Sequence, residues 1–510
     1  MYWSAFIVFL VLFLLVTILG FSASRWHRGD LNLIEEWGLA GRRFGTFVTW
    51  FLLGGDLYTA YTFIAVPALV YGTGAFGFFA VPYTIIVFPI MYVVIPRLWR
   101  VSKRHKYVTA ADFVRGRFDS SLLALAVAIT GILATMPYIA LQLTGIQAVL
   151  AVMGLAGHGF MKDLPLVIAF IILAAYTYNS GLRAPALTAI LKDILIYVTV
   201  IVACIAIPMQ LGGYGHIFHV AATTLAAHKG AMILPPKMYS AFATLALGSA
   251  FALLLYPHAV TGSLGAKSGS TIQRNAALLP LYSLALTFIA LLGYMAIAAG
   301  IHTKDTSLVV PLLFIKTLPT WFAGFAFGAI AIGALVPAAI MAIAAANLFT
   351  RNIYREYFMQ DEGPNREAQV AKIVGLVVIL GALLFIVAIP LQYSIYFQTL
   401  GGMWILQTVP VIIFGLYTRW FHRWALFLGW LIGMVFGTWM AAEESFKTSI
   451  YPLHLGHTVI LGYAGIWALV VNIIIAFVFS IVFNGMHLSN GQDETDVHDY
   501  DTEPGKEVAQ

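Results

Sequence analysis

The sequence predicts an all-α membrane protein with about thirteen transmembrane helices. Of its 510 residues, 61% are hydrophobic and only 10% are charged, whereas about 25% are charged in a typical soluble domain. Apolar runs of about 20 residues, each long enough to cross the hydrocarbon core of a bilayer, recur along almost the whole chain. Because no polar segment of domain size interrupts them, we expect a single membrane domain.

Thirteen apolar runs define the predicted spans. They cover residues 2–22, 44–70, 76–96, 121–155, 164–180, 188–211, 239–261, 276–300, 321–349, 371–389, 395–417, 424–441 and 459–484. The fourth and ninth runs are longer than a span requires, so we expect these helices to tilt or to extend beyond the bilayer. In the first run Arg25 and Arg28 follow the apolar stretch instead of preceding it, which is unlike a signal peptide. We therefore expect this run to be retained as a helix.

The basic residues predict the topology. Of the 28 Lys and Arg residues, 22 lie in alternate connecting segments or in the tail; these connecting segments are 23–43, 97–117, 181–192, 263–274, 350–372 and 419–423. Because basic loops favour the cytoplasmic side, the N-terminus is predicted outside and the C-terminus inside. The basic pI thus reflects topology, and nucleic acid is not an expected partner. The single Cys204 excludes a disulfide framework and a multi-cysteine metal site.

Two spans carry corresponding interruptions. The second contains Gly54-Gly55 and then Pro67; the seventh contains Gly248-Ser249 and then Pro257, at offsets of 194 and 190 residues. Paired Gly/Pro-interrupted spans indicate the binding site of a transporter built from inverted repeats, although glycine also serves plain helix packing in membranes. Five spans in each half give the two halves opposite topology.

These observations divide the chain into six predicted segments. They are the first helix and its cytoplasmic loop (1–43), the first repeat (44–211), an extracytoplasmic loop (212–238), the second repeat (239–417), the last two helices (418–488) and a tail (489–510). The tail has seven acidic residues within 493–507 and no apolar pattern, which predicts disorder.

Asp56 is the only carboxylate that we place deep in the membrane. It follows Gly54-Gly55 in an otherwise apolar run, and a charge at bilayer depth costs about 2.5–3.5 kcal/mol even on the insertion scale that gives the lowest values. Asp56 is therefore predicted to bind an ion or a proton, with a purely structural carboxyl as the alternative. We place no Lys or Arg at that depth, and the lack of a permanent counter-charge favours a small monocarboxylate over a more strongly charged anion.

Three stretches resemble the solute:sodium symporter family: 109–118 (TAADFVRGRF), 180–193 (SGLRAPALTAILKD) and 338–355 (AAIMAIAAANLFTRNIYR). The stretch 256–262 (YPHAVTG) is most similar to bacterial monocarboxylate uptake permeases, with the acetate and proline permeases related. The resemblance implies the leucine-transporter-type 5+5 inverted-repeat fold with extra helices. It also implies uptake of small acids such as lactate, pyruvate, acetate or propionate.

The chain departs from the family where a sodium ion is expected. The family pattern has two adjacent hydroxyl residues after the ninth-span Ala-Ala motif, and we align Ala342 and Ile343 with them. Sodium is a hard cation that prefers several oxygen ligands, so this departure favours a proton as the coupling ion. No other metal and no cofactor is expected.

The candidate site residues lie near the two interruptions. We expect Asp56 to carry the coupling proton, and family likeness suggests an ion-exit role for Asp193, with a local salt bridge to Lys192 equally open. The predicted substrate-binding residues are Tyr58, Thr59, Gln142, Tyr256, His258 and Trp404. For each of these, helix packing or a backbone hydrogen bond is the alternative role.

The sequence thus predicts a multi-pass symporter of a bacterial cytoplasmic (inner) membrane that imports small monocarboxylates by alternating access, coupled to protons. Alternatives are sodium coupling, an amino acid substrate such as proline or alanine, and a symporter-like sensor. An enzyme is not expected, because we find no nucleophile–base pair or metal-ligand cluster at membrane depth.

Overall fold

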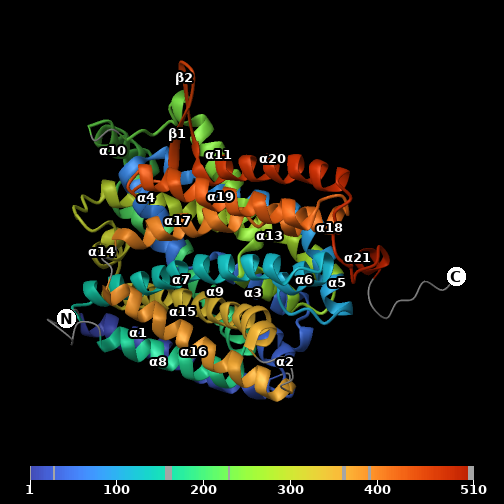
Figure 1. Ribbon diagram of the computed structural model, residues 1–510. Coiled ribbons are helices and arrows are strands. Elements are labelled where there is room, and N and C mark those ends of the chain that lie inside the picture. The colour runs from blue at the N-terminus through green and yellow to red at the C-terminus, as the bar shows by residue number, and fades with distance from the viewer. Residues whose placement is uncertain are drawn as a thin grey trace.

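The computed structural model describes residues 2–26, 29–155, 164–227, 230–358, 363–388 and 392–502, without the side chains of 385–398. Long helices run side by side through the molecule (Figure 1). They are α1 (Trp3–Ser22), α3 (Thr46–Leu57) with α4 (Val66–Thr73), α5 (Ala80–Arg104), α7 (Ser121–Val152), α8 (Leu164–Ser180), α9 (Arg183–Gln210), α11 (Tyr239–Leu255) with α12 (Pro257–Leu264), α13 (Gly269–Ala298), α15 (Thr320–Phe349), α16 (Pro364–Ala388), α17 (Gln392–Leu406), α19 (Arg423–Glu443) and α20 (Ala464–Gly485).

Shorter elements connect these helices. They are α2 (Ile34–Leu39), α6 (Ala110–Phe118), α10 (Gly213–Ala227), α14 (Val309–Thr317), α18 (Gly415–Tyr417), α21 (His498–Asp501), the strands β1 (Ile450–Leu455) and β2 (Thr458–Tyr463), and the π-helical segments η3 (Tyr61–Ala65), η8 (Thr350–Phe358) and η9 (Pro410–Phe414). Five 3₁₀ turns complete the set: Ala23–Arg25, Ala40–Arg42, Ala75–Phe79, Pro236–Met238 and Thr306–Leu308.

The all-helical membrane fold predicted from hydropathy is confirmed. Eleven described helices are long and apolar enough to cross a membrane, and the bent pair α3 and α4 makes a twelfth span. The apolar helix α8 has 17 residues, and each of the thirteen predicted runs overlaps one of these helices. Several helices extend a few residues beyond their runs. At one boundary the type of element differs: residues 459–463 belong to a β-hairpin and α20 begins at Ala464, because β-branched residues follow the turn at Gly456.

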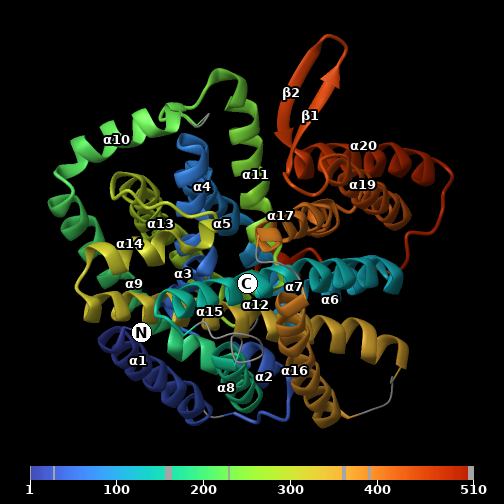
Figure 2. The same ribbon diagram turned by 90° about the vertical axis from the view of Figure 1, so that its left-hand side faces the viewer.

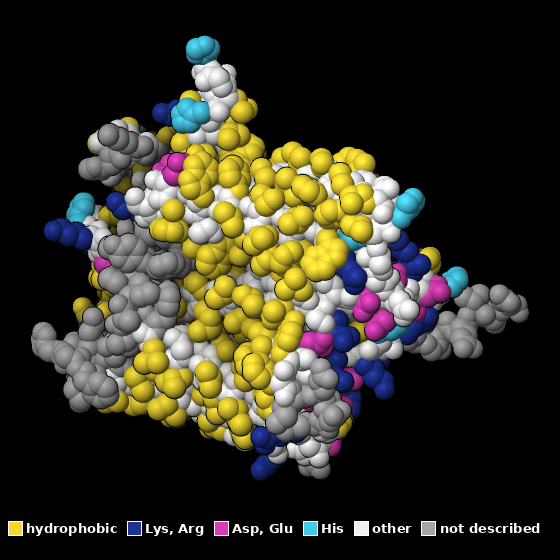
Figure 3. All heavy atoms as spheres, in the orientation of Figure 1, with side chains coloured by type: hydrophobic (Ala, Val, Ile, Leu, Met, Phe, Trp, Pro, Cys, Tyr) yellow, Lys and Arg dark blue, Asp and Glu magenta, His cyan; other side chains and the backbone are white. Residues whose placement is uncertain are grey.

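Charged side chains gather at one end of the bundle. In Figure 3 the Lys, Arg, Asp and Glu side chains cluster at the right, where α6, α18 and α21 lie in Figure 1, and apolar side chains cover the middle. The hairpin and α10 lie at the opposite end. This distribution follows the basic-loop pattern that predicts a cytoplasmic face at the charged end.

The helix α15 forms the centre of the packing. Every residue of its apolar window is buried, and it contacts α1, α7 and α9 (Figure 2). Its sequence is rich in Ala and Gly, which lets the neighbouring backbones approach closely. At Gly324, for example, an added Cβ would lie 2.3 Å from the carbonyl oxygen of Ala5.

Both predicted helix breaks occur, a few residues later than the glycine pairs suggested. Gly54 and Gly55 lie within α3, and the first break spans residues 58–60, where the chain bends by 42°. The second break is at Tyr256, whose ψ of 137° ends α11. Proline disfavours helical geometry in the residue before it, so Pro257, and not Gly248, sets the second break. At Gly54 the missing side chain instead admits the Tyr282 ring, which an added Cβ would meet at 3.0 Å.

The tail differs from the predicted disorder over the residues that the structure describes. Residues 489–502 pack on the charged end of the bundle, where Asp499 pairs with Arg104 at 2.9 Å and Asp493 with Arg117 at 2.9 Å. The acidic residues from which we predicted a disordered tail thus form ion pairs with basic residues of the segments from which we predicted the topology. Residues 503–510 lie outside the described part of the chain.

Candidate substrate and ion site

The first break is held by hydrogen bonds to its opened backbone. The amide of Ala60 donates to Gln142 Oε1 at 3.0 Å, and the amide of Thr59 donates to Thr62 Oγ1 at 3.0 Å. The amide of Tyr61 donates to Thr59 Oγ1 at 3.0 Å. Gln142 and Thr59 were both predicted to bind substrate. In the structure their side chains accept hydrogen bonds from the backbone of the first break, which is the alternative role that we considered for them.

The second break presents aromatic and imidazole side chains. Tyr256 is the residue between α11 and α12, and His258 follows Pro257 in the first turn of α12. Tyr138 on α7 lies beside them, with ring centroids 5.5 Å from Tyr256 and 5.4 Å from His258. Tyr138 is not among the site residues predicted from the sequence; Pro137, inside a predicted span, is the sequence signal next to it.

Asp56 and His258 connect the two breaks. The Asp56 Oδ2 atom lies 3.5 Å from His258 Nε2, and both side chains are buried. Neither ring nitrogen of His258 has a hydrogen-bond partner among the described residues, and Asp56 Oδ1 has none there either. Buried polar atoms are seldom left unpaired in proteins, so this cluster offers positions at which a polar ligand or a proton can bind.

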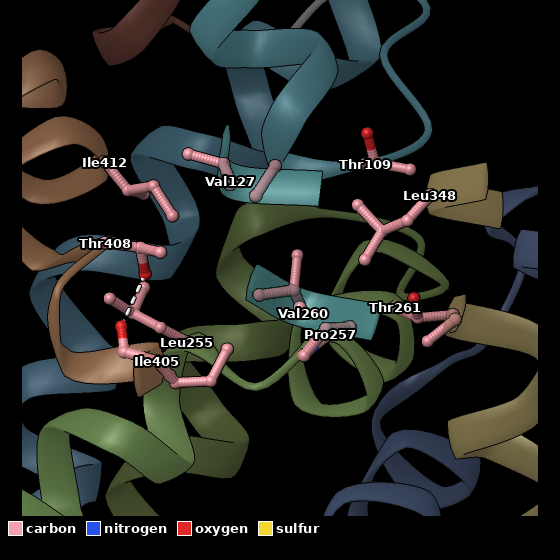
Figure 4. A pocket seen from close by; sticks show the side chains of 13 residues that line it. Thr109, Val127, Leu255, Pro257, Val260, Thr261, Leu348, Ile405, Thr408 and Ile412 are labelled. Atoms are coloured by element: carbon pink, nitrogen blue, oxygen red, sulfur yellow. Dashed lines mark hydrogen bonds between the residues drawn. The ribbon is translucent and has the colours of Figure 1, made fainter. Parts of the chain in front are cut away.

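Small cavities surround this cluster. One of about 40 Å³ lies between Tyr83, Tyr138, Tyr256 and Tyr463, and another of about 30 Å³ adjoins Asp56. A third, of about 20 Å³, is lined by Pro257, Thr261, Leu348 and Thr408 among others (Figure 4). Volumes of this size hold about one water each.

Lys192 is the largest departure from the sequence-based expectations. The helix α9 begins at Arg183 near the charged end, and nine further residues at 1.5 Å each place Lys192 about 13 Å along it. This is close to half the hydrocarbon thickness. We expected Lys192 in the loop 181–192, but it lies inside the bundle at the level of the first break, and the adjacent Asp193 is buried with it.

The ammonium group of Lys192 contacts the first break directly. Lys192 Nζ donates to the carbonyl oxygen of Gly55 and, at 2.9 Å, to that of Tyr58. It also lies 3.2 Å from Asp193 Oδ1, which is the salt bridge considered as one role of Asp193. Neither Lys192 nor Asp193 is exposed.

Two other predicted substrate residues point elsewhere. The hydroxyl of Tyr58 donates to the carbonyl oxygen of Tyr282, and the rings of the two tyrosines stack on each other. The indole of Trp404 donates to Thr438 Oγ1 on α19 at 3.0 Å. The structure therefore brings Asp56, Tyr256 and His258 together and leaves Tyr58 and Trp404 outside the cluster.

Ala342 and Ile343 do not lie beside the carbonyl groups of the first break. On α15, Gly333 lies close to the Tyr58 carbonyl, and a Cβ added there would lie 3.8 Å from that oxygen. Ala342 follows nine residues later, about 13 Å further along the helix. The lack of side-chain oxygen ligands at these two positions nevertheless holds for this whole stretch of α15, since no residue between Thr320 and Asn347 has a side-chain oxygen.

Comparisons with known proteins agree with this architecture. Residues 37–436 match the Sodium:solute symporter family. A "monocarboxylate transport permease protein" of Rhizobium johnstonii is 53% identical over 480 residues, which cover 93% of this chain and 96% of the relative. The uncharacterized symporter YodF of Bacillus subtilis is 36% identical over 488 residues, 94% of each chain.

A solved structure of a Na⁺-coupled sialic acid symporter is similar in fold. It superposes with a TM-score of 0.75 at 16% identity and covers 94% of this chain and 98% of its own. The leucine-transporter-type fold is therefore confirmed, and these relatives are transporters, not enzymes. The chain belongs to the sodium:solute symporter family and is a multi-pass membrane symporter.

Proposed function

We propose that the protein imports small monocarboxylates, such as lactate, pyruvate, acetate or propionate, together with protons, across a bacterial inner membrane. The apposition of Asp56 and His258 between the two helix breaks carries this proposal. The relative from Rhizobium johnstonii, described as a monocarboxylate transport permease, supports the substrate class.

The charge of the cluster explains why acid and proton would move together. The ammonium of Lys192 is balanced by Asp193, which leaves Asp56 and His258. A substrate carboxylate beside an ionised Asp56 would be repelled, and this repulsion is strong where water is excluded. A proton on Asp56 removes the repulsion, so each ligand favours the binding of the other.

His258 and the tyrosines supply hydrogen-bond donors for the carboxylate. A neutral imidazole has one N–H donor and a phenol has one O–H donor. Tyr138 and Tyr256 flank His258 on two different elements. Such donors bind one carboxylate without a permanent positive charge, whereas a dianion would remain undercompensated.

The test is uptake of labelled lactate into proteoliposomes, with an inward proton gradient compared with an inward sodium gradient. We expect protons alone to drive accumulation. The Asp56→Asn variant should reduce accumulation to the level of empty liposomes, because the amide cannot carry the proton. Asp305→Asn, at an exposed helix cap, is the matched control and should transport normally.

Three results would contradict the proposal. Accumulation that requires sodium would assign the coupling to another ion and remove the proton role of Asp56. Undiminished proton-driven uptake by a folded Asp56→Asn variant would do the same. Failure of every tested monocarboxylate, with uptake of proline or alanine, would replace the substrate class.

A further inference from the structure

The groups around Lys192 resemble a binding site for a cation, in which the cation is the ammonium group of Lys192 itself. Two carbonyl oxygens of the broken span, from Gly55 and Tyr58, converge on one point. They are three residues apart and lie where α3 ends. Carbonyl oxygens at the end of a broken membrane helix are a common way to hold a coupling cation.

The ammonium group fills this site with two hydrogen bonds and one ion pair. It has three N–H donors and no acceptor; it donates to the carbonyl oxygens of Gly55 and Tyr58, and it lies 3.2 Å from the Asp193 carboxylate. The carboxylate also balances its charge. A buried ion is tolerated only when it is paired in this way, so the geometry fits a charged lysine.

A sodium ion does not fit the same surroundings. The carbonyl oxygens face Nζ, and the neighbouring stretch of α15 offers no side-chain ligand. Gly333 lies close to the Tyr58 carbonyl, and Val336 and Pro337 follow one turn later. Hard cations require several oxygen ligands, so this site lacks the donors that sodium needs.

We infer that the Lys192 ammonium takes the place of the coupling sodium ion, as a resident cation that fastens the broken span α3 to α9. This inference explains how a chain of this family would work without sodium, and in that respect it rests on the proposed function. It predicts that removing the amine creates a site for a small free cation between Gly55, Tyr58 and Asp193.

The test is the thermal unfolding of the purified full-length protein in detergent, with no transported acid present. The wild type should show the same Tm in sodium chloride and in choline chloride. Lys192→Ala should lower Tm by several degrees, because Asp193 and the two carbonyl groups lose their partner. Methylammonium should restore part of this loss, whereas tetramethylammonium, which has no N–H donor and is too large, should not.

Two further variants separate this role from simple packing. Lys192→Met removes the charge but fills the space, so it should be destabilised and should not respond to methylammonium. Lys316→Ala also removes a lysine that donates to a backbone carbonyl, that of Ala299 at 2.6 Å, but at an exposed position. It should respond to neither sodium nor methylammonium.

The inference is overturned if sodium specifically stabilises the wild type. It is also overturned if Lys192→Ala unfolds like the wild type, or is destabilised without any response to methylammonium. If Lys192→Ala cannot be purified, the sodium response of the wild type decides. Because none of these measurements uses a transported acid, a wrong substrate class in the proposed function leaves them interpretable.

Discussion

The two helix breaks face the same core, but the polar groups at each break find hydrogen-bond partners in different ways. At the first break, Gln142, Thr59 and Thr62 bond the freed amides, and Lys192 bonds two carbonyl groups. At the second, Pro257 removes the amide that would need a partner, and the ring nitrogens of His258 have no hydrogen-bond partner among the described residues. The first break is thus supported by the chain itself, and the second leaves polar groups for a ligand.

Under the proposed function, this difference separates residues that stabilise the fold from residues that bind the substrate. Changes at the first break should act on stability, because they remove hydrogen bonds already made in the protein. Changes at the second should act on transport, because they remove groups that gain their partner with the substrate. Sequence position alone did not distinguish the two groups, since both lie beside an interruption.

After the complete loss of accumulation expected for Asp56→Asn, the largest effect on transport is expected from His258→Gln. The change keeps a polar side chain of similar size but alters the donor geometry, so we expect KM for lactate to rise about 10–100-fold, as for the loss of a hydrogen bond to a charged group. Tm should change little. Kinetics in proteoliposomes and thermal unfolding test both parts, and a large fall in Tm with unchanged KM would reverse the assignment of the second break.

Gln142→Ala should show the opposite behaviour. It leaves the buried amide of Ala60 without its acceptor, which costs about 1–3 kcal/mol of stability. Thermal unfolding should detect this loss, and Gln142→Glu, which keeps an acceptor oxygen, is the matched control. Normal stability combined with a raised KM would show that Gln142 contacts substrate instead of supporting the break.

Two glycines on α7 offer a further comparison of the breaks. An added Cβ at Gly145 would lie 2.5 Å from the Cβ of Ala60 in the first break, whereas at Gly131 it would meet Leu348 Cδ1 at 2.7 Å and Pro257 Cγ at 2.8 Å. The Leu348 side chain can move, and the rigid Pro257 ring is met less closely than the Ala60 Cβ, which cannot move. We therefore expect Gly145→Ala to cost more of the roughly 1–3 kcal/mol typical of overpacking, and paired thermal unfolding curves test this order.

The smallest effect is expected far from both breaks, in the tail. Burial by itself acts to raise the pKa of Asp499, but hydrogen bonds from the Asp496 amide, His105 and Arg104 outweigh it, and the pKa is lowered. A lowered pKa means that this contact is fully present above the ordinary aspartate value of about 3.9 and is lost as pH falls through the lowered value.

Limited proteolysis of the tail measures this contact. Asp499→Asn should expose the tail at pH 7, while Tm and lactate uptake stay near the wild-type values, because this contact joins the tail to the end of α5, far from both breaks. In the wild type, the cleavage pattern should be the same at pH 7 and pH 5. A loss of transport in Asp499→Asn would instead tie the tail to the function of the two breaks.

The sequence by itself determined the membrane architecture. Long apolar runs identified the helices because a span must bury about 20 consecutive apolar residues, and alternate basic loops predicted the charged end. Gly, Pro and Asp56 marked both interruptions to within a few residues. Each of these signals is local, so it can be read from neighbouring residues alone.

Only the tertiary structure decided which polar side chains meet. It paired Asp56 with His258 across 202 positions of sequence, added Tyr138, turned Trp404 toward α19 and placed Lys192 against the Gly55 and Tyr58 carbonyl groups. In these helices most faces are apolar, so hydropathy does not reveal which way a single polar residue points. Its partner is set by the packing of distant helices, and that packing made Lys192 part of the core instead of part of a basic loop.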